Sequence, residues 1–174
     1  QITEIMDVPD APTIGTPSDV GTSRPYNNAS ATIAVTAAAT GGTPTSYTVT
    51  STPGSLTGTG TSSPITVTGL NSQTSYTFTV SGTNSSATGP NSSSSSAVVV
   101  TSVPDAPTAP TATNQGTNRA YNNGQASVAF SAPASGGKSI SSYTVTSSPG
   151  GFTGTGATSP ITVTGLQSAT AYTY

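Results

Sequence analysis

The side chains that most often do chemistry in proteins are scarce in this sequence. Its 174 residues include no His and no Cys, so it lacks imidazole bases, thiol nucleophiles and thiolate metal ligands. Nucleophilic catalysis needs a nucleophile beside a base, and glycoside hydrolysis needs two carboxylates facing one bond. Neither arrangement is apparent, because the few carboxylates lie near predicted domain entries and linkers. We therefore predict no enzyme activity, no catalytic residue and no cofactor.

Two further patterns could bind small ions. Asp7, Asp10 and Asp105 lie near predicted domain junctions and carry the oxygen ligands that Ca²⁺ prefers. An Asp beside Pro more often favours a turn, so we predict no metal site. The segment Gly58-Thr59-Gly60 is rich in glycine, but phosphate-binding loops need a strand-to-helix context and usually a Lys. We expect these residues to be turn or edge glycines.

The charge of the chain excludes two classes of partner. Only three residues are Lys or Arg, against five Asp and Glu. Nucleic-acid binding depends on clustered cations, and three scattered ones cannot form such a surface. No apolar run approaches the roughly 20 residues that a membrane-spanning helix needs. We predict neither nucleic-acid binding nor membrane insertion.

One tripeptide occurs twice and could contact a partner from a loop. It is Tyr26-Asn27-Asn28, which returns as Tyr121-Asn122-Asn123. Exposed Tyr and Asn side chains in loops can bind a surface glycan or a protein receptor. The alternative interpretation is turn chemistry, in which Asn shapes the backbone and Tyr covers the end of a domain. Both interpretations stay open from the sequence.

These segments belong to a long internal repeat. Val8–Thr13 recurs as Val103–Thr108, which is 95 residues later (103 minus 8). After the paired glycines Gly41-Gly42 and Gly136-Gly137 the second copy has one extra residue, which indicates a loop. A period near 95 suits a whole sandwich domain rather than a solenoid repeat. We predict one domain over 8–102, a second over 103–174, and a linker or last strand of a preceding repeat over 1–7.

The segments between turn residues alternate apolar and small polar side chains, which indicates strands with one buried face. Examples are Tyr47-Thr48-Val49, Ile65-Thr66-Val67 and Tyr76-Thr77-Phe78-Thr79-Val80. No stretch has helical periodicity. A disordered linker is the rival interpretation of so much Ser, Thr, Gly and Pro, but the alternation and the repeat argue against it. The sequence predicts an all-β protein of tandem antiparallel sandwiches.

The chain resembles the fibronectin type III fold over nearly its whole length. The residues that carry the resemblance are the entry Pro9-Asp10-Ala11-Pro12, the strand Tyr47-Thr48-Val49, and Gly69-Leu70 followed by Tyr76. The resemblance implies seven strands per copy, so the second copy, which ends at Tyr174 within its sixth strand, would be incomplete. It also implies a buried structural corner, formed by Tyr76 with Leu70 and by Tyr172 with Leu166. The usual Trp of the second strand is absent, and Val35 and Phe130 take its place.

The Thr-rich, charge-poor style is similar to that of repeats in bacteriophage structural proteins and bacterial surface proteins. This similarity implies a non-catalytic spacer and interaction module of a virion appendage, such as a fibre, decoration or tail protein, at the virion surface. The alternative is a bacterial cell-surface adhesin, or accessory repeats of a secreted carbohydrate-active enzyme. Expected partners are other copies of the chain or other structural subunits, and a surface glycan or protein receptor.

Overall fold

The computed structural model describes residues 7–174, so nearly all of the expected 1–7 segment lies outside the described residues. Every regular element in this range is a β-strand. Between residues 7 and 174 there is no helix long and apolar enough to cross a membrane. The chain divides into two compact units, of which unit 1 ends at Val103 and also takes in Gly136–Lys138, while unit 2 comprises Pro104–Ser135 and Ser139–Tyr174.

Unit 1 is built from short strands that follow one another along the chain. They are β1 (Thr13–Ile14), β2 (Ser18–Asp19), β3 (Ala29–Ile33), β4 (Val35–Thr36), β5 (Ser46–Thr52), β6 (Thr57–Gly60), β7 (Ile65–Leu70), β8 (Ser75–Thr83) and β9 (Val98–Val99). β1 pairs with β4, and β2 pairs with β3, so each of the first two strands is interrupted. The segments of unit 1 therefore fill seven strand positions.

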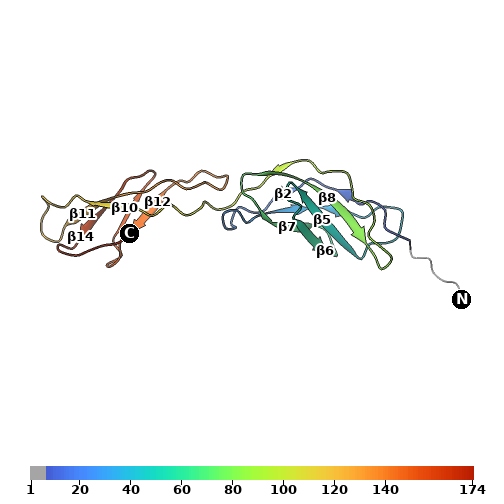
Figure 1. The fold of residues 1–174 in the computed structure, drawn as a ribbon, viewed down its shortest axis with the longest axis horizontal. Coiled ribbons are helices and arrows are strands. Elements are labelled where there is room, and N and C mark those ends of the chain that lie inside the picture. The colour runs from blue at the N-terminus through green and yellow to red at the C-terminus, as the bar shows by residue number, and fades with distance from the viewer. Residues whose placement is uncertain (1–6) are drawn as a thin grey trace. The chain divides into compact units, whose positions relative to one another are not determined.

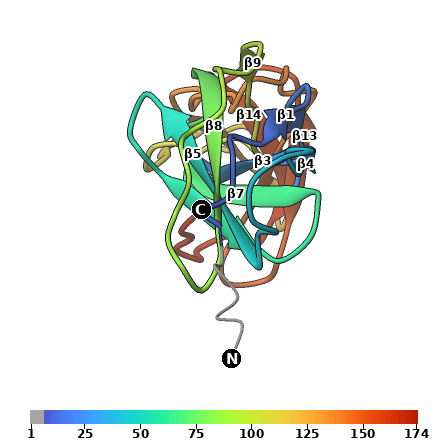
Figure 2. The same ribbon diagram turned by 90° about the vertical axis from the view of Figure 1, so that its right-hand side faces the viewer.

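Two antiparallel sheets enclose the core of unit 1. One has the order β2-β3-β7 and the other β6-β5-β8-β9 (Figures 1 and 2). Residues of both sheets join in a single buried cluster, which makes the unit a sandwich. The cluster consists of Ala29, Ala31, Ile33, Val35, Val49, Ile65, Val67, Leu70, Tyr76, Phe78, Val80 and Val100.

The alternation in the sequence decides which face of each strand is buried. In β7, Ile65 and Val67 are buried while Thr66 and Thr68 are exposed. Thr suits the outer face because its branched Cβ favours extended backbone and its hydroxyl stays hydrated. The predicted all-β fold of antiparallel sandwiches is confirmed.

Unit 2 repeats the same pairings with fewer strands. Its strands are β10 (Thr111–Asn114), β11 (Gly124–Ala129), β12 (Tyr143–Thr146), β13 (Thr153–Gly156) and β14 (Ile161–Leu166), in the sheets β10-β11-β14 and β12-β13. The register matches that of unit 1, since Val128 lies opposite Ile161 as Ile33 lies opposite Ile65. A core of Ala126, Val128, Val145, Ile161, Val163 and Leu166 fills the space between these sheets.

Of the two expectations for Gly58-Thr59-Gly60, turn glycines or edge glycines, the structure bears out the second, because these residues lie in the edge strand β6. Tyr47 lies opposite Gly60, and Val49 lies opposite Gly58. A Cβ at Gly58 would collide with the backbone carbonyl oxygen of Thr66 in the facing sheet. The glycine is therefore needed for close approach of two backbones rather than for a turn.

The last strand of unit 1 is short. Only Val98 and Val99 pair with β8 as a strand. Before them, serine side chains bond the outer edge of β8. Ser92 N donates to the Val80 carbonyl at 2.8 Å, and Val80 N donates to Ser92 Oγ at 3.0 Å. Serine side chains and serine backbone amides together close this edge, in place of a regular ladder.

The two units differ most at the sixth strand. In unit 1, β8 pairs with β5 from Ser46, opposite Thr83, to Thr52, opposite Thr77. In unit 2 the corresponding pairing is a single bridge between Ser148 and Thr173. Within residues 7–174, β12 therefore has a strand neighbour on one side only, which is β13.

Candidate functional site: loop clamps and an apolar hollow of unit 2

The predicted structural corner contains a hydrogen bond between a Tyr hydroxyl and the backbone in each unit. The Tyr76 side chain is 3% exposed, and Asn71 N donates to its hydroxyl at 3.0 Å. Leu70, at the end of β7, is fully buried beside it in the core. These contacts fix the loop between β7 and β8, so the Tyr76 hydroxyl stabilises the corner.

The corner of unit 2 has the same hydrogen bond in a more solvent-exposed position. Gln167 N donates to the Tyr172 hydroxyl at 2.9 Å, and this contact is exposed. Leu166 is 5% exposed in the core. The Tyr172 ring packs edge-on against Phe152, with ring centroids 6.1 Å apart.

The Asn residues at the centre of the repeated tripeptide bind the protein's own backbone. Asn27 has φ 55°, in the left-handed region that Asn tolerates better than most residues. Its Oδ1 accepts from Ser72 N at 3.2 Å, and its own N donates to Ser72 Oγ at 3.0 Å. Asn122 and Ser168 form the same reciprocal pair, at 3.0 and 2.9 Å. We call each of these pairs an Asn–Ser clamp.

An Arg completes each loop. Arg24 Nε donates to the Asn28 carbonyl at 2.6 Å, and its Nη2 donates to Asn28 Oδ1 at 3.0 Å. In unit 2, Arg119 Nε donates to the Asn123 carbonyl at 2.8 Å. The polar groups of the tripeptides thus serve mainly to shape the loops.

The tyrosines that begin the tripeptides differ in exposure. Tyr26 is half-buried, whereas Tyr121 is 84% exposed. An aromatic ring with this exposure is unusual, since Tyr normally covers its ring with apolar neighbours. Among the residues predicted to contact a partner, Tyr121 presents the largest free surface.

The carboxylates of the described chain lie apart from one another. No group of three or more acidic side chains with metal-ligand spacing occurs among residues 7–174. Each Asp accepts hydrogen bonds from nearby neutral groups. Asp10 Oδ2 accepts from Thr40 Oγ1 at 2.6 Å, Asp19 Oδ2 from Thr101 Oγ1 at 2.6 Å, and Asp105 Oδ1 from Ala106 N at 2.8 Å. These contacts favour a turn and loop role for the aspartates.

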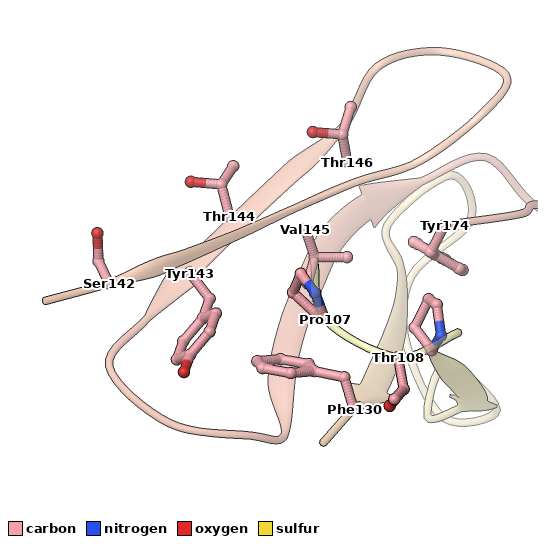
Figure 3. A pocket seen from close by; sticks show the side chains of 10 residues that line it. Pro107, Thr108, Phe130, Ser142, Tyr143, Thr144, Val145, Thr146 and Tyr174 are labelled. Carbon is pink, nitrogen blue, oxygen red and sulfur yellow. The ribbon is translucent and has the colours of Figure 1, made fainter. Parts of the chain in front are cut away.

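An apolar hollow that could hold a partner lies in unit 2. It has a volume of about 420 Å³ and opens beside β12 (Figure 3). Tyr143 and Val145 point into it from β12, on the same side as Phe130, while Thr144 and Thr146 point away. The hollow is lined by Pro107, Thr108, Pro110, Phe130, Ser142, Tyr143, Thr144, Val145, Thr146 and Tyr174. No side chain of this lining is ionised at neutral pH.

Aromatic contacts give the hollow its shape. The rings of Phe130 and Tyr143 lie with centroids 4.8 Å apart at 55°. Burial in this apolar setting, with a smaller contribution from Tyr172, raises the pKa of Tyr174 above the usual value. The hollow therefore disfavours charge, and it suits an uncharged, apolar occupant.

Sequence reasoning did not identify this hollow. Alternation assigns Tyr143 and Val145 to one face of a strand, but no local pattern places Phe130 beside Tyr143, because Phe130 follows β11, which lies in a different sheet from β12.

Some solved structures are similar to this chain. No family model matches the chain, and no curated protein matches it. Among solved structures, the chain is similar to chicken CNTN1 FN1–FN3 domains, with 18% identity, a TM-score of 0.45, and coverage of 90% of this chain and 52% of that one. It is also similar to titin kinase and its flanking domains, with 19% identity, a TM-score of 0.44, and coverage of 71% of this chain and 27% of that one. The chain thus spans about half or less of these structures.

Proposed function

We propose that this chain is a non-catalytic structural module, which spaces and packs the parts of a bacteriophage appendage such as a fibre, decoration or tail protein. The observation that carries the proposal is the use of the repeated polar residues. Asn27, Tyr76 and Arg24, and their counterparts in unit 2, all bond the protein's own backbone. Because these polar side chains bond the backbone of their own unit in both copies, they stabilise the fold of the module.

The composition of the surface supports a packing role. Outer strand positions are mostly Thr and Ser, as in β7 and β14, and the chain has only eight charged residues. Little electrostatic repulsion therefore opposes close packing against copies of the chain or other structural subunits. In addition, no buried side-chain nitrogen or oxygen in residues 7–174 lacks a hydrogen-bond partner, which suits a stable spacer.

Immunogold electron microscopy tests the location. Antibodies raised against the chain are applied to virus particles and to cells from the source of the sequence. Labelling of projecting appendages on particles is the expected result. Labelling confined to the bacterial envelope or to a secreted enzyme would refute the virion assignment and support the alternative of a surface adhesin or accessory repeats.

Light scattering tests the packing role. We expect the mean mass of the full chain to rise with concentration, because its uncharged faces associate. A mass that stays that of a monomer at high concentration would contradict self-association. Turnover of any substrate by the chain would contradict the non-catalytic assignment.

A second role, contact with a surface glycan or protein receptor, is favoured by one observation, which is the exposed ring of Tyr121. Such rings stack on sugars and anchor protein contacts. We expect Tyr121→Ala to weaken binding to host cells, while the matched Tyr26→Ala has a smaller effect because that ring is half-buried. Equal binding by the wild type and by Tyr121→Ala would remove this role.

A further inference from the structure

We propose that copies of this chain pair through the outer sides of β6 and β13, which we call the β6 edge and the β13 edge. Both strands have the sequence Thr-Gly-Thr-Gly. The partner of each edge is a strand of the same sequence in a second copy, in antiparallel orientation. This pairing rests on the self-association in the proposed function and specifies the surface through which it occurs.

The hydrogen bonds between β5 and β6 determine which backbone groups of β6 point outward. Ser51 N donates to the Leu56 carbonyl at 2.8 Å. In an antiparallel ladder the bonded pairs recur at every second residue, so Gly58 also bonds β5. Thr57 and Thr59 therefore direct their backbone N–H and C=O groups away from β5. β6 is the last strand of its sheet, and within residues 7–174 no hydrogen bond outside the ladder involves either threonine.

The same geometry holds in unit 2. Ser147 N donates to the Phe152 carbonyl at 2.8 Å, and the ladder between β12 and β13 keeps this register. By the same alternation, Thr153 and Thr155 direct their backbone groups away from β12. β13 is also the last strand of its sheet. Each unit therefore offers the same outward backbone groups on a strand of the same sequence.

The β6 edge lacks the features that usually prevent pairing of sheet edges, which are charged side chains, prolines and bulges. No charged residue occurs in the sequence between Arg24 and Asp105, and no proline occurs between Pro53 and Pro64. The register of β6 with β5 is regular from end to end. A second strand can therefore approach this edge without burying an ion or losing an N–H donor.

The other edges of unit 1 are protected. On the opposite edge of the same sheet, Ser92 bonds Val80 of β8 through both its N–H and its Oγ. The facing sheet ends on one side in the two-residue strand β2, which carries Asp19. It ends on the other side in β7, where the Thr66 carbonyl oxygen lies against Gly58. Protection of these edges leaves β6 as the side of the sandwich best suited to accept a strand.

The β6 edge is complementary to itself. A two-fold axis through Gly58 places Thr57 of one copy opposite Thr59 of the other, and each such pair exchanges two backbone hydrogen bonds. Both threonine side chains are exposed, and threonines opposite each other across two strands stabilise a sheet. Because each chain carries two such edges, association continues beyond the dimer.

The first experiment measures amide hydrogen exchange of the full chain at increasing concentration, read by nuclear magnetic resonance after dilution. When about nine-tenths of the edges are paired, exchange at Thr57 and Thr59 slows by about tenfold, because only the unpaired fraction exchanges. Thr153 and Thr155 slow in the same way. The amide of Gly58 is the internal control, and its rate changes far less because it bonds β5 in every copy.

Matched variants separate backbone pairing from packing of threonine side chains. Thr59→Pro removes an outward N–H, and proline is tolerated at this kind of edge position. Thr59→Val keeps the N–H and the branched side chain and loses only the hydroxyl group. By light scattering, Thr59→Pro stops at the dimer because the β13 edge remains, and the chain with both Thr59→Pro and Thr155→Pro is a monomer. Thr59→Val associates like the wild type. Slow exchange at the buried Val67 verifies that unit 1 is folded in each variant.

Three results would overturn the pairing and leave the general packing role standing. The first is association of the wild type with no change of exchange at Thr57 and Thr59. The second is undiminished association of the doubly substituted chain, because another surface would then join the copies. The third is equal loss of association in Thr59→Val and Thr59→Pro, since side chains and not backbone groups would then be responsible. A wild-type chain that stays monomeric overturns both the pairing and the packing role.

Discussion

Removing one hydroxyl group from the corner of unit 1 tests whether that corner stabilises the sandwich. Tyr76→Phe keeps the ring, so the buried apolar area is unchanged. The variant loses the 3.0 Å bond from Asn71 N, whose donor then lacks its partner. A neutral hydrogen bond contributes about 1 kcal/mol, and an unpaired donor with some access to water adds a fraction more. We expect unit 1 to lose about 1.5 kcal/mol.

The matched substitution in unit 2 provides the control. The bond from Gln167 N to Tyr172 lies in an exposed setting, where water can replace the hydroxyl. Tyr172→Phe should therefore cost about 0.5 kcal/mol, the lower end for a hydrogen bond. The difference between the losses of unfolding free energy in the two variants measures the effect of burying the hydrogen bond, because the substitution removes the same hydroxyl group in both.

Urea unfolding followed by hydrogen exchange resolves the two units. Exchange at Val67 reports on unit 1, and exchange at Val163 reports on unit 2, since both residues are fully buried. A loss of 1.5 kcal/mol corresponds to a fall of about 6 to 12 °C in the Tm of a domain of this size. A loss below about 0.5 kcal/mol in Tyr76→Phe, or an equal loss in Tyr172→Phe, would refute the reasoning.

Four further outcomes follow from the structure. Gly58→Ala should destabilise unit 1 by more than about 2 kcal/mol in urea unfolding, because the added Cβ would collide with backbone atoms. Gly69→Ala should cost about 1 kcal/mol, because Gly69 has φ 76° but open space around it. Equal losses of stability in the two variants would contradict this reasoning. Asn27→Ala should speed amide exchange at Ser72, while Asn27→Asp should not, because a carboxylate oxygen still accepts from that amide. The pKa of Tyr174 is raised in the folded chain, so its contribution to the stability of unit 2 should be fully present below a pH of about 10 and be lost as the pH rises through the folded pKa. In urea titrations over a series of pH values, Tyr174→Phe should remove this part of the loss of stability. Chelation of divalent cations should leave the melting temperature of the chain unchanged, because its described carboxylates are dispersed; a lower melting temperature would reveal a cation site.

The loops show how far residue types predict a role. From the sequence, Asn27 and Asn122 had two interpretations, contact with a partner or turn chemistry. The structure places each beside a serine 45 or 46 residues away. No local pattern indicates which of many serines is the partner, because that choice depends on how β3 and β7 pair.

The strands, their buried faces and the repeat could be predicted from the residue pattern alone. Alternation is a local property, because successive side chains of a strand point to opposite sides, so Ile65 and Val67 could be assigned to the core without a partner. Glycine carries no such information, so the sequence left Gly58 either in a turn or at a sheet edge, and the structure places it in the edge strand β6. The pairing of sheet edges depends on the folded chain, since hydrogen bonds across a sheet join residues far apart in the sequence. The hollow beside Phe130 has the same origin, because Phe130 and Tyr143 come from different sheets.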